Sequence, residues 1–266
     1  MVGQQDLVIT GTASIGAAQF PSDGSEVEEL VRKADIAMYS AKQRGGNQVR
    51  FYSDRLEDHA RHRAAQRAEI HSAIDENQFM PYFQPVIDAH TDAPVGAEVL
   101  ARWVHPHRGV LAPIDFLEAT TALHLLDGMT GRILAQVVAE LPAIRAACAG
   151  LQISVNLAPE QLRGAGTVDM ILGVVGMDLS GWKFEVTETT AFGSDRSIIE
   201  NLQRLRAAGA HLSLDDFGTG YSSVSRLRAF GFDEVKIDRE FVMHSGDGAV
   251  PALVVAMIDM AHALGA

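Results

Sequence analysis

Apolar residues between positions 79 and 266 follow two alternating patterns, short runs rich in β-branched side chains and longer stretches with helical spacing. The short runs predict strands, which we place at residues 80–86, 95–103, 152–156, 183–186, 211–214 and 234–237. The longer stretches predict helices at residues 127–147, 194–208 and 248–264, with shorter ones near 113–121, 160–175 and 222–229. Strands that alternate with helices are typical of a parallel α/β fold, and six of them indicate most of a (β/α)8 TIM-type barrel.

The length of this segment adds an expectation about the barrel. A complete barrel of this type needs about 250 residues, whereas 188 residues run from Phe79 to the end of the chain (266 − 79 + 1). The last predicted element is a helix. The sequence therefore predicts a barrel that lacks its last two strand–helix units.

The first 77 residues have a different pattern. Residues 7–18 and 49–52 predict strands, and between them Ser25 and Glu28 predict a capping box that opens a helix. These elements are too few to enclose a hydrophobic core. They therefore predict a fragment of an α/β domain. Residues 54–77, rich in Arg, Glu, His and Ala, predict a solvated linker helix. The predicted domains are therefore residues 1–53, the linker 54–77 and the barrel segment 78–266.

Composition and charge narrow the function classes. The chain has 22 Lys and Arg against 34 Asp and Glu, a formal charge of −12, so binding to DNA or RNA polymers through counterion release is not expected. A phosphate compound would have to be attracted locally, by metal ions or a few placed cations. No apolar run reaches the roughly 18 residues of a membrane span. Cys148 is the only cysteine in the sequence, which favours a reducing, cytoplasmic setting.

Polar and charged side chains stand at the ends of five successive predicted strands. They are Glu98, Asn156, Glu185, Glu188, Asp215, Asp216, Lys236 and Asp238. In an α/β barrel the C-terminal ends of the strands converge on one face, where active sites lie. Carboxylates gathered in a partly buried site repel one another, so either their pKa values rise or cations neutralise them. All-oxygen ligand sets favour hard ions such as Mg²⁺ or Mn²⁺. Any one of these residues alone also fits a solvated loop; their joint occurrence favours a metal site.

The adjacent pair Asp215 and Asp216 is followed by a segment that contains Gly218, Gly220 and several hydroxyl residues. Where a strand ends and the chain turns, both carboxylates can reach one cavity. Two metal ions about 3.5–4 Å apart can activate a water molecule and stabilise the leaving oxygen of a phosphodiester. An Asp-Asp-Phe-Gly string by itself fits a turn or a helix cap equally well.

Residues 79–266 resemble an EAL-type cyclic di-GMP phosphodiesterase domain. The motifs that carry the resemblance are residues 82–85 (YFQP), 96–103 (GAEVLARW), 105–109 (HPHRG), 154–157 (SVNL), 185–188 (EVTE), 215–223 (DDFGTGYSS) and 236–238 (KID). The triplet that names the family reads Glu98-Val99-Leu100 here, with Val in place of Ala, and keeps the carboxylate.

The resemblance implies a metal site with two Mg²⁺ or Mn²⁺ ions. The implied metal ligands are Glu98, Asn156, Glu185, Asp215 and, for the second ion, Asp216. The implied reaction is hydrolysis of one phosphodiester bond of cyclic di-GMP to give linear pGpG.

Other residues take supporting roles by the same resemblance. Lys236 would position or polarise the attacking water, and Glu188 would anchor the loop that follows the two aspartates. Gln84, Arg102 and Asp238 would contact the dinucleotide. The resemblance also allows a homodimer.

Residues 8–52 resemble the C-terminal part of a GGDEF diguanylate cyclase domain, on the strength of residues 14–16 (SIG) and 34–42 (ADIAMYSAK). The signature loop of that family is not in the sequence, so cyclase activity is not expected. Members of the EAL family also continue beyond Leu264-Gly265 with a glutamate and a glutamine of the catalytic set, which predicts a C-terminally truncated domain.

Three interpretations stay open at this point. The chain is a phosphodiesterase, if the missing glutamate is not essential or another chain completes the barrel. Alternatively it is a catalytically inactive cyclic-di-GMP-binding or regulatory fragment, or a remnant that does not fold alone.

Overall fold

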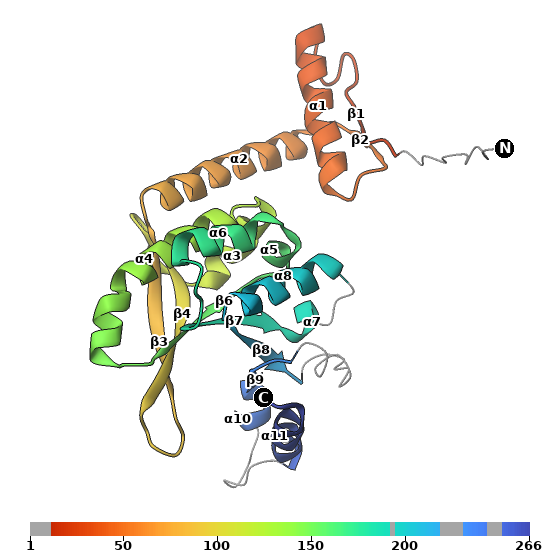
Figure 1. Ribbon diagram of the computed structural model, residues 1–266. Helices are drawn as coiled ribbons and strands as arrows, with labels where there is room; N and C mark the ends of the chain where they lie inside the picture. Colours follow the sequence, from red (N-terminus) through yellow and green to blue (C-terminus); the bar gives the residue numbers. More distant parts are fainter. Residues whose placement is uncertain (1–11, 192–194, 219–230, 244–251) are drawn as a thin grey trace, which may run out of the picture. The chain divides into compact units, whose positions relative to one another are not determined.

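The computed structural model describes residues 12–191, 195–218, 231–243 and 252–266. The chain divides into two compact units, Met1–Glu69 and Ile70–Ala266 (Figure 1). The helix predicted near 222–229 lies outside the described residues, as do the first residues of the strand predicted at 7–18.

The first unit is built around one helix and two short parallel strands. Strand β1 (Ile15–Ala17) pairs in parallel with β2 (Val49–Phe51), and helix α1 (Val27–Gln43) connects them. The predicted capping box is wrong, because α1 begins after Glu26 without a side-chain cap. The backbone amide of Ser25 donates instead to the side chain of Glu29, one residue beyond the expected acceptor.

Helix α2 (Asp54–Asp75) forms the predicted helix after the second strand. Its last two turns are not solvated as expected, because Ile70, Ala73 and Ile74 are buried in the hydrophobic core of the second unit. Their spacing of three and four residues places these side chains on one face of the helix. In the described residues, no helix has both the length and the apolar character that a membrane crossing requires.

The second unit contains a sheet with the strand order β3-β4-β6-β7-β8-β9. Its strands are β3 (Phe79–Ile87), β4 (Pro94–His105), β6 (Gln152–Asn156), β7 (Trp182–Thr187), β8 (His211–Phe217) and β9 (Glu234–Ile237). Pairing is parallel from β4 to β9, which confirms the predicted α/β class. The first pair differs, since β3 runs antiparallel to β4. Only six residues join these two strands, too few for the crossover that a parallel pair needs.

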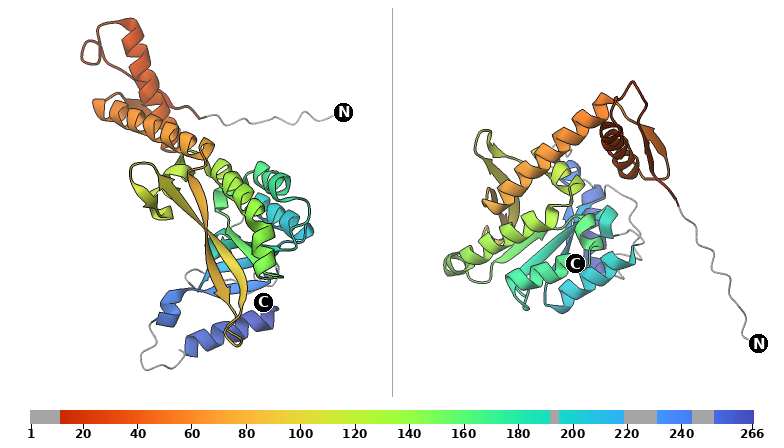
Figure 2. Two further views of the ribbon diagram at one scale, coloured as in Figure 1. Left: turned by 90° about the vertical axis from the view of Figure 1, so that its left-hand side faces the viewer. Right: turned by 90° about the horizontal axis from the view of Figure 1, so that it is seen from above.

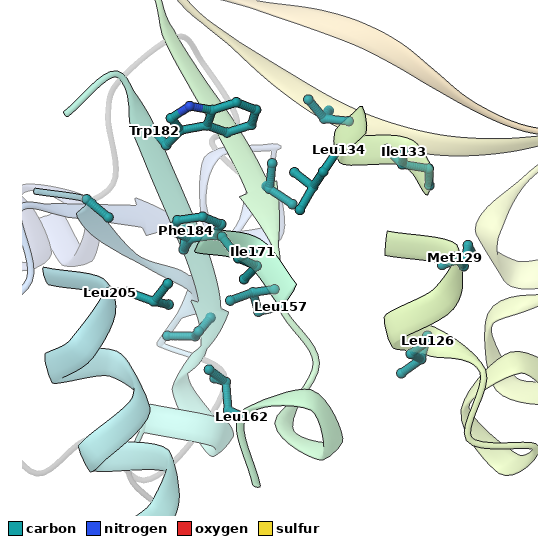
Figure 3. Packing of buried hydrophobic residues seen from close by; sticks show 14 of the residues in the cluster. Leu126, Met129, Ile133, Leu134, Leu157, Leu162, Ile171, Trp182, Phe184 and Leu205 are labelled. Carbon is teal, nitrogen blue, oxygen red and sulfur yellow. The ribbon is translucent and has the colours of Figure 1, made fainter. Parts of the chain in front are cut away.

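Three helices lie side by side over one face of this sheet, as the views in Figures 1 and 2 show. They are α4 (Leu126–Ala147), α6 (Gly166–Val175) and α8 (Arg196–Ala207). Alternate strand residues face them, and Trp182 and Phe184 of β7 pack among Leu134, Ile171 and Leu205 (Figure 3). The residues between them in the strands project from the opposite face, because successive side chains of a strand point to opposite sides.

The remaining elements complete the described fold. They are β5 (Gly109–Leu111), which pairs with β4, η1 (Pro113–Asp115), α3 (Leu117–Ala122), α5 (Pro159–Arg163), α7 (Glu188–Ala191), α10 (Arg239–Met243) and α11 (Ala252–Leu264). Over the described residues, the strand path runs from β3 to β9 without closing into a ring.

Candidate active site

Strand register brings the polar side chains of the predicted site to the sheet face opposite α4, α6 and α8. Asn156 of β6 pairs with Glu185 of β7, and Thr187 pairs with Asp215 of β8. The expectation that Glu98 ends its strand is wrong, because β4 continues to His105. Parallel pairing of β4 with β6 nevertheless stops at Val99, while pairing with β3 holds the rest of β4 in place. Glu98 therefore stands at the end of the parallel part of the sheet.

Lys236 of β9 is the centre of this group. Its Nζ atom donates to Glu185 Oε2 at 2.6 Å and to Glu98 Oε2 at 3.0 Å, and it lies 3.6 Å from Asp215 Oδ1. Asn156 Nδ2 donates to the other oxygen of Glu98 at 2.8 Å. Five residues from five different strands thus meet at one place, and we call them the acid cluster: Glu98, Asn156, Glu185, Asp215 and Lys236.

Burial and charge shift the ionisation of the cluster. The side chain of Glu185 is 2% exposed, and its burial raises its pKa above the ordinary value, although the hydrogen bond from Lys236 opposes this. Burial alone would lower the pKa of Lys236, but the hydrogen bond to Glu185, with further contributions from Glu98 and Asp215, raises it well above the ordinary value. Lys236 therefore stays protonated and neutralises part of the charge of the three carboxylates.

A β-bulge gives Asp215 and Asp216 separate directions. Leu214 pairs with Val235 and Phe217 pairs with Ile237, so two residues of β8 stand opposite Lys236 alone. Asp216 takes the left-handed conformation, with φ of 54°. Burial, and then the charges of Asp215 and Asp238, raise the pKa of Asp216. The bulge thus lets adjacent aspartates serve one site, Asp215 beside Lys236 and Asp216 beside Asp238.

Glu188 follows the end of β7 and is 1% exposed. Its Oε2 accepts a hydrogen bond from the backbone amide of Gly218 at 2.9 Å. Gly218 lies directly after β8, so the contact ties the end of β8 to the start of α7. Through Gly218, Glu188 is linked to the end of the strand that carries Asp215 and Asp216.

Gly218→Ala is expected to lower the free energy of unfolding by about 2–4 kcal/mol, because it adds left-handed strain to a steric clash. Gly218 has φ of 101°, and an added Cβ would lie 2.6 Å from Met257 Cε and 2.9 Å from Phe241 Cε2. Gly109→Ala is the control, since Gly109 has φ of 74° and open space around it. Urea unfolding of both variants measures the difference. Equal losses at the two positions would contradict the close packing at Gly218.

The residues expected to bind the dinucleotide stand on the same face as Glu98 or at its edge. Gln84 of β3 lies opposite Glu98 in the ladder, and Arg102 lies four residues beyond Glu98 on β4. The guanidinium carbon of Arg102 is 5.6 Å from the ring centre of Tyr82, a cation–π contact that orients it. Asp238 Oδ1 accepts from the backbone amide of Glu240 at 2.7 Å, at the start of α10.

A second row of polar residues below the acid cluster was not predicted. Lys183, Ser213 and Glu234 stand two positions before Glu185, Asp215 and Lys236 on the same three strands. Lys183 Nζ donates to Glu234 Oε2 at 2.5 Å, and Ser213 Oγ donates to Glu234 Oε1 at 3.1 Å. The sequence signal was the alternation of charges, Lys-Phe-Glu on one strand and Glu-Val-Lys on the other.

The acid cluster has the donor chemistry of a divalent-metal site. Its three carboxylates and one amide offer oxygen atoms, which suit Mg²⁺ or Mn²⁺. In the part of the chain that the structure describes, no three His, Cys, Asp or Glu side chains are already spaced as a metal-binding group. The ammonium of Lys236 lies among the carboxylates and holds them as an ion-pair network.

Two protein families match the chain. The model of the EAL domain matches residues 67–266, more than half of the chain, and that of the diguanylate cyclase GGDEF domain matches residues 2–48. An uncharacterized signaling protein of Caulobacter vibrioides is 34% identical over 95% of this chain and 31% of its own length. The cyclic di-GMP phosphodiesterase NbdA of Pseudomonas aeruginosa is 31% identical over 94% of this chain and 33% of its own length. The chain therefore spans about a third of the length of these curated relatives.

A solved structure, the PaMucR phosphodiesterase in complex with c-di-GMP, is similar in fold. It superposes with a TM-score of 0.67 and 31% identity, over 75% of this chain and 83% of that one.

Proposed function

The chain belongs to the EAL domain family, and from this premise we propose that it hydrolyses cyclic di-GMP to linear pGpG with divalent cations. The match also confirms the resemblance seen in the sequence, including the short GGDEF segment at residues 2–48. The observation that carries the proposal is the convergence of Glu98, Glu185 and Asp215 on Lys236. NbdA, a relative at 31% identity, is a cyclic di-GMP phosphodiesterase.

The residues in and around the acid cluster have separate proposed roles in the reaction. Glu98, Asn156, Glu185 and Asp215 would hold one cation, with Asp216 directed at a second. Such ions, when bound, supply charge that activates a water molecule and stabilises the leaving oxygen. Lys236 keeps a proton on Nζ and offers positive charge beside the carboxylates. Glu188 holds the backbone at Gly218, the residue directly after β8.

We propose that residues beside the acid cluster bind the dinucleotide. Arg102 offers planar guanidinium donors to a phosphate group, a geometry that allows two parallel hydrogen bonds. Its contact with Tyr82 limits the rotamers that it must give up on binding. Gln84 and Asp238 are proposed to contact the ligand as well, Gln84 from β3 and Asp238 from the end of β9.

The direct test is incubation of the purified chain with cyclic di-GMP and Mn²⁺, with the products separated by reversed-phase chromatography. The proposal expects linear pGpG, and no product when EDTA replaces Mn²⁺. Binding of cyclic di-GMP without any product would overturn the hydrolysis proposal and support the non-catalytic binding interpretation.

Metal binding is expected to depend on pH. Burial raises the pKa of Glu185 and of Asp216 above their ordinary values, so their contribution to stability is present at low pH and is lost as pH rises through the folded pKa. Protons and cations compete for these carboxylates. A Mn²⁺ excess of about 100 Kd is therefore expected to raise Tm by about 5–10 °C at pH 7.5, and by much less near pH 4.5. Differential scanning fluorimetry measures both shifts, with Asp259→Asn on the exposed face of α11 as a control that behaves like the parent chain. Equal shifts at the two pH values would contradict the assignment.

Three wider features stay part of the proposal. Residues 1–53, 54–77 and 78–266 are proposed as the GGDEF-like fragment, the linker helix and the EAL-like domain. A cytoplasmic location suits a soluble dinucleotide substrate and a lone cysteine. A homodimer is compatible with the family and is tested by light scattering of the purified chain.

A further inference from the structure

Two ion pairs link β7 to β9 across the strand between them. Lys183 of β7 donates to Glu234 of β9 at 2.5 Å, and two residues further along, Lys236 of β9 donates to Glu185 of β7 at 2.6 Å. The two pairs run in opposite senses, since the lysine comes from β7 in the first and from β9 in the second. Each strand therefore carries one positive and one negative side chain on the same face.

The Lys183–Glu234 pair is buried on the lysine side and partly exposed on the glutamate side. The side chain of Lys183 is 11% exposed and that of Glu234 is 38% exposed. Ser213, which is fully buried, donates to the second oxygen of Glu234 at 3.1 Å. Both oxygens of Glu234 thus have a donor, and the orientation of its carboxylate is set from β7 and from β8.

Each lysine also lies near the glutamate of the other ion pair. A strand rises about 3.3 Å per residue, so side chains two positions apart on one strand start about 6.6 Å from each other. Glu234 stands at that spacing from Lys236, and Lys183 stands at that spacing from Glu185. A long flexible lysine side chain can cover much of this distance.

We propose that Lys183 and Glu234 are positioning residues. Because their charges pair with each other, neither competes for Lys236 or Glu185, and Lys236 stays with the acid cluster. This inference rests on the proposed function for both of its readouts, cation binding by the acid cluster and turnover. With Lys183 removed, the Glu234 carboxylate competes for the ammonium of Lys236 and draws it away from Glu98 and Glu185. With Glu234 neutralised, the ammonium of Lys183 competes with Lys236 for Glu185. Removal of both charges leaves neither competitor.

The test uses Lys183→Met, Glu234→Gln and the double variant in the full chain, with Mn²⁺ affinity measured by isothermal titration calorimetry. Lys183→Met is expected to bind Mn²⁺ about fivefold more tightly, because Lys236 no longer neutralises the carboxylates fully, and Glu234→Gln about fivefold more weakly, because a second ammonium joins them. The double variant is expected to return to within about twofold of the parent chain.

Turnover gives a second readout. Each single variant is expected to lose about tenfold in kcat with KM changed less than twofold, because Lys236 is misplaced, and the double variant is expected to regain most of the loss. If the Lys183–Glu234 pair only stabilises the fold, both single variants should bind Mn²⁺ more weakly and the double variant should show no recovery. That result would overturn the inference.

The two proposals fail in different ways. A parent chain that binds Mn²⁺ but makes no pGpG would overturn the proposed hydrolysis, while the affinity pattern of the three variants would still decide the role of Lys183 and Glu234. If Lys183→Met does not fold by circular dichroism, Glu234→Gln and the double variant carry the decision: weaker binding in the first and recovery in the second support the inference, and equal weakening in both overturns it.

Discussion

Asp215→Asn is expected to reduce the turnover of cyclic di-GMP by more than about 100-fold, since changes to the outer partners of metal ligands already cost about 10–100-fold. The substitution keeps the shape of the side chain and replaces one carboxylate oxygen by an amide nitrogen that cannot bind a cation. Asp215 lies 3.6 Å from Lys236 Nζ in the β8 bulge, where no neighbouring residue duplicates its position. The loss is expected in kcat, measured by chromatography of pGpG at saturating substrate.

Asp215→Asn is expected to fold like the parent chain. The charge of Asp215 is one of the causes that raise the pKa values of Glu185 and Asp216, so its removal relieves repulsion within the metal-free cluster. The substitution also removes the attraction between Asp215 and Lys236, so Tm in EDTA should stay close to that of the parent chain. Asp259→Asn, an exposed change on α11, serves as the control with unaltered turnover. Full turnover in Asp215→Asn would refute the assignment of this carboxylate to the metal site.

Lys236→Met is expected to separate stability from metal binding. In EDTA the variant should lose about 2–3 kcal/mol of unfolding free energy, below the 3–5 kcal/mol typical of a broken buried pair because the Lys236 side chain is 30% exposed. Glu185, at 2% exposed, then carries a buried charge without its cation. Turnover is expected to fall at least tenfold, because Lys236 supplies the charge that we propose acts on the attacking water.

Mn²⁺ should restore the stability of this variant more than it stabilises the parent chain, since the ion supplies the charge that Lys236 supplied. Thermal unfolding with and without Mn²⁺ measures the difference. Lys42→Met, an exposed substitution on α1, is the matched control and should show the parent response. A Mn²⁺ shift no larger than that of the parent chain would show that Lys236 and the cation do not share the carboxylates.

Local pattern was enough to place most strands of the second unit. Residues 152–156 and 234–237 were assigned with the bounds that the structure has, because each short apolar run is enclosed by turn residues or helices. The bounds of β4 differ from the predicted 95–103 by one residue at the start and two at the end, where β4 continues to His105 by pairing with the adjacent strand β5. The strand predicted at 95–103 already contains Glu98, but the local sequence does not show that parallel pairing with β6 stops at Val99.

The local sequence likewise predicts only part of the candidate site. Carboxylates at strand ends were visible in the sequence because an α/β topology gathers strand ends at one face. The bulge at Asp215 and Asp216 was not, since the sequence does not reveal which residues of β9 they oppose. Lys183 and Glu234 were missed because each alone is an ordinary charged residue, and only the register of three strands makes them partners.

Diffraction from crystals grown with Mn²⁺, recorded at the manganese absorption edge, tests the shared-cation account most directly. We predict an anomalous difference peak within about 2–2.5 Å of oxygen atoms from Glu98, Asn156, Glu185 and Asp215, the bond lengths of hard cations, with the ammonium of Lys236 moved aside. A map in which manganese binds elsewhere, while Lys236 keeps its contacts with Glu98 and Glu185, would contradict it.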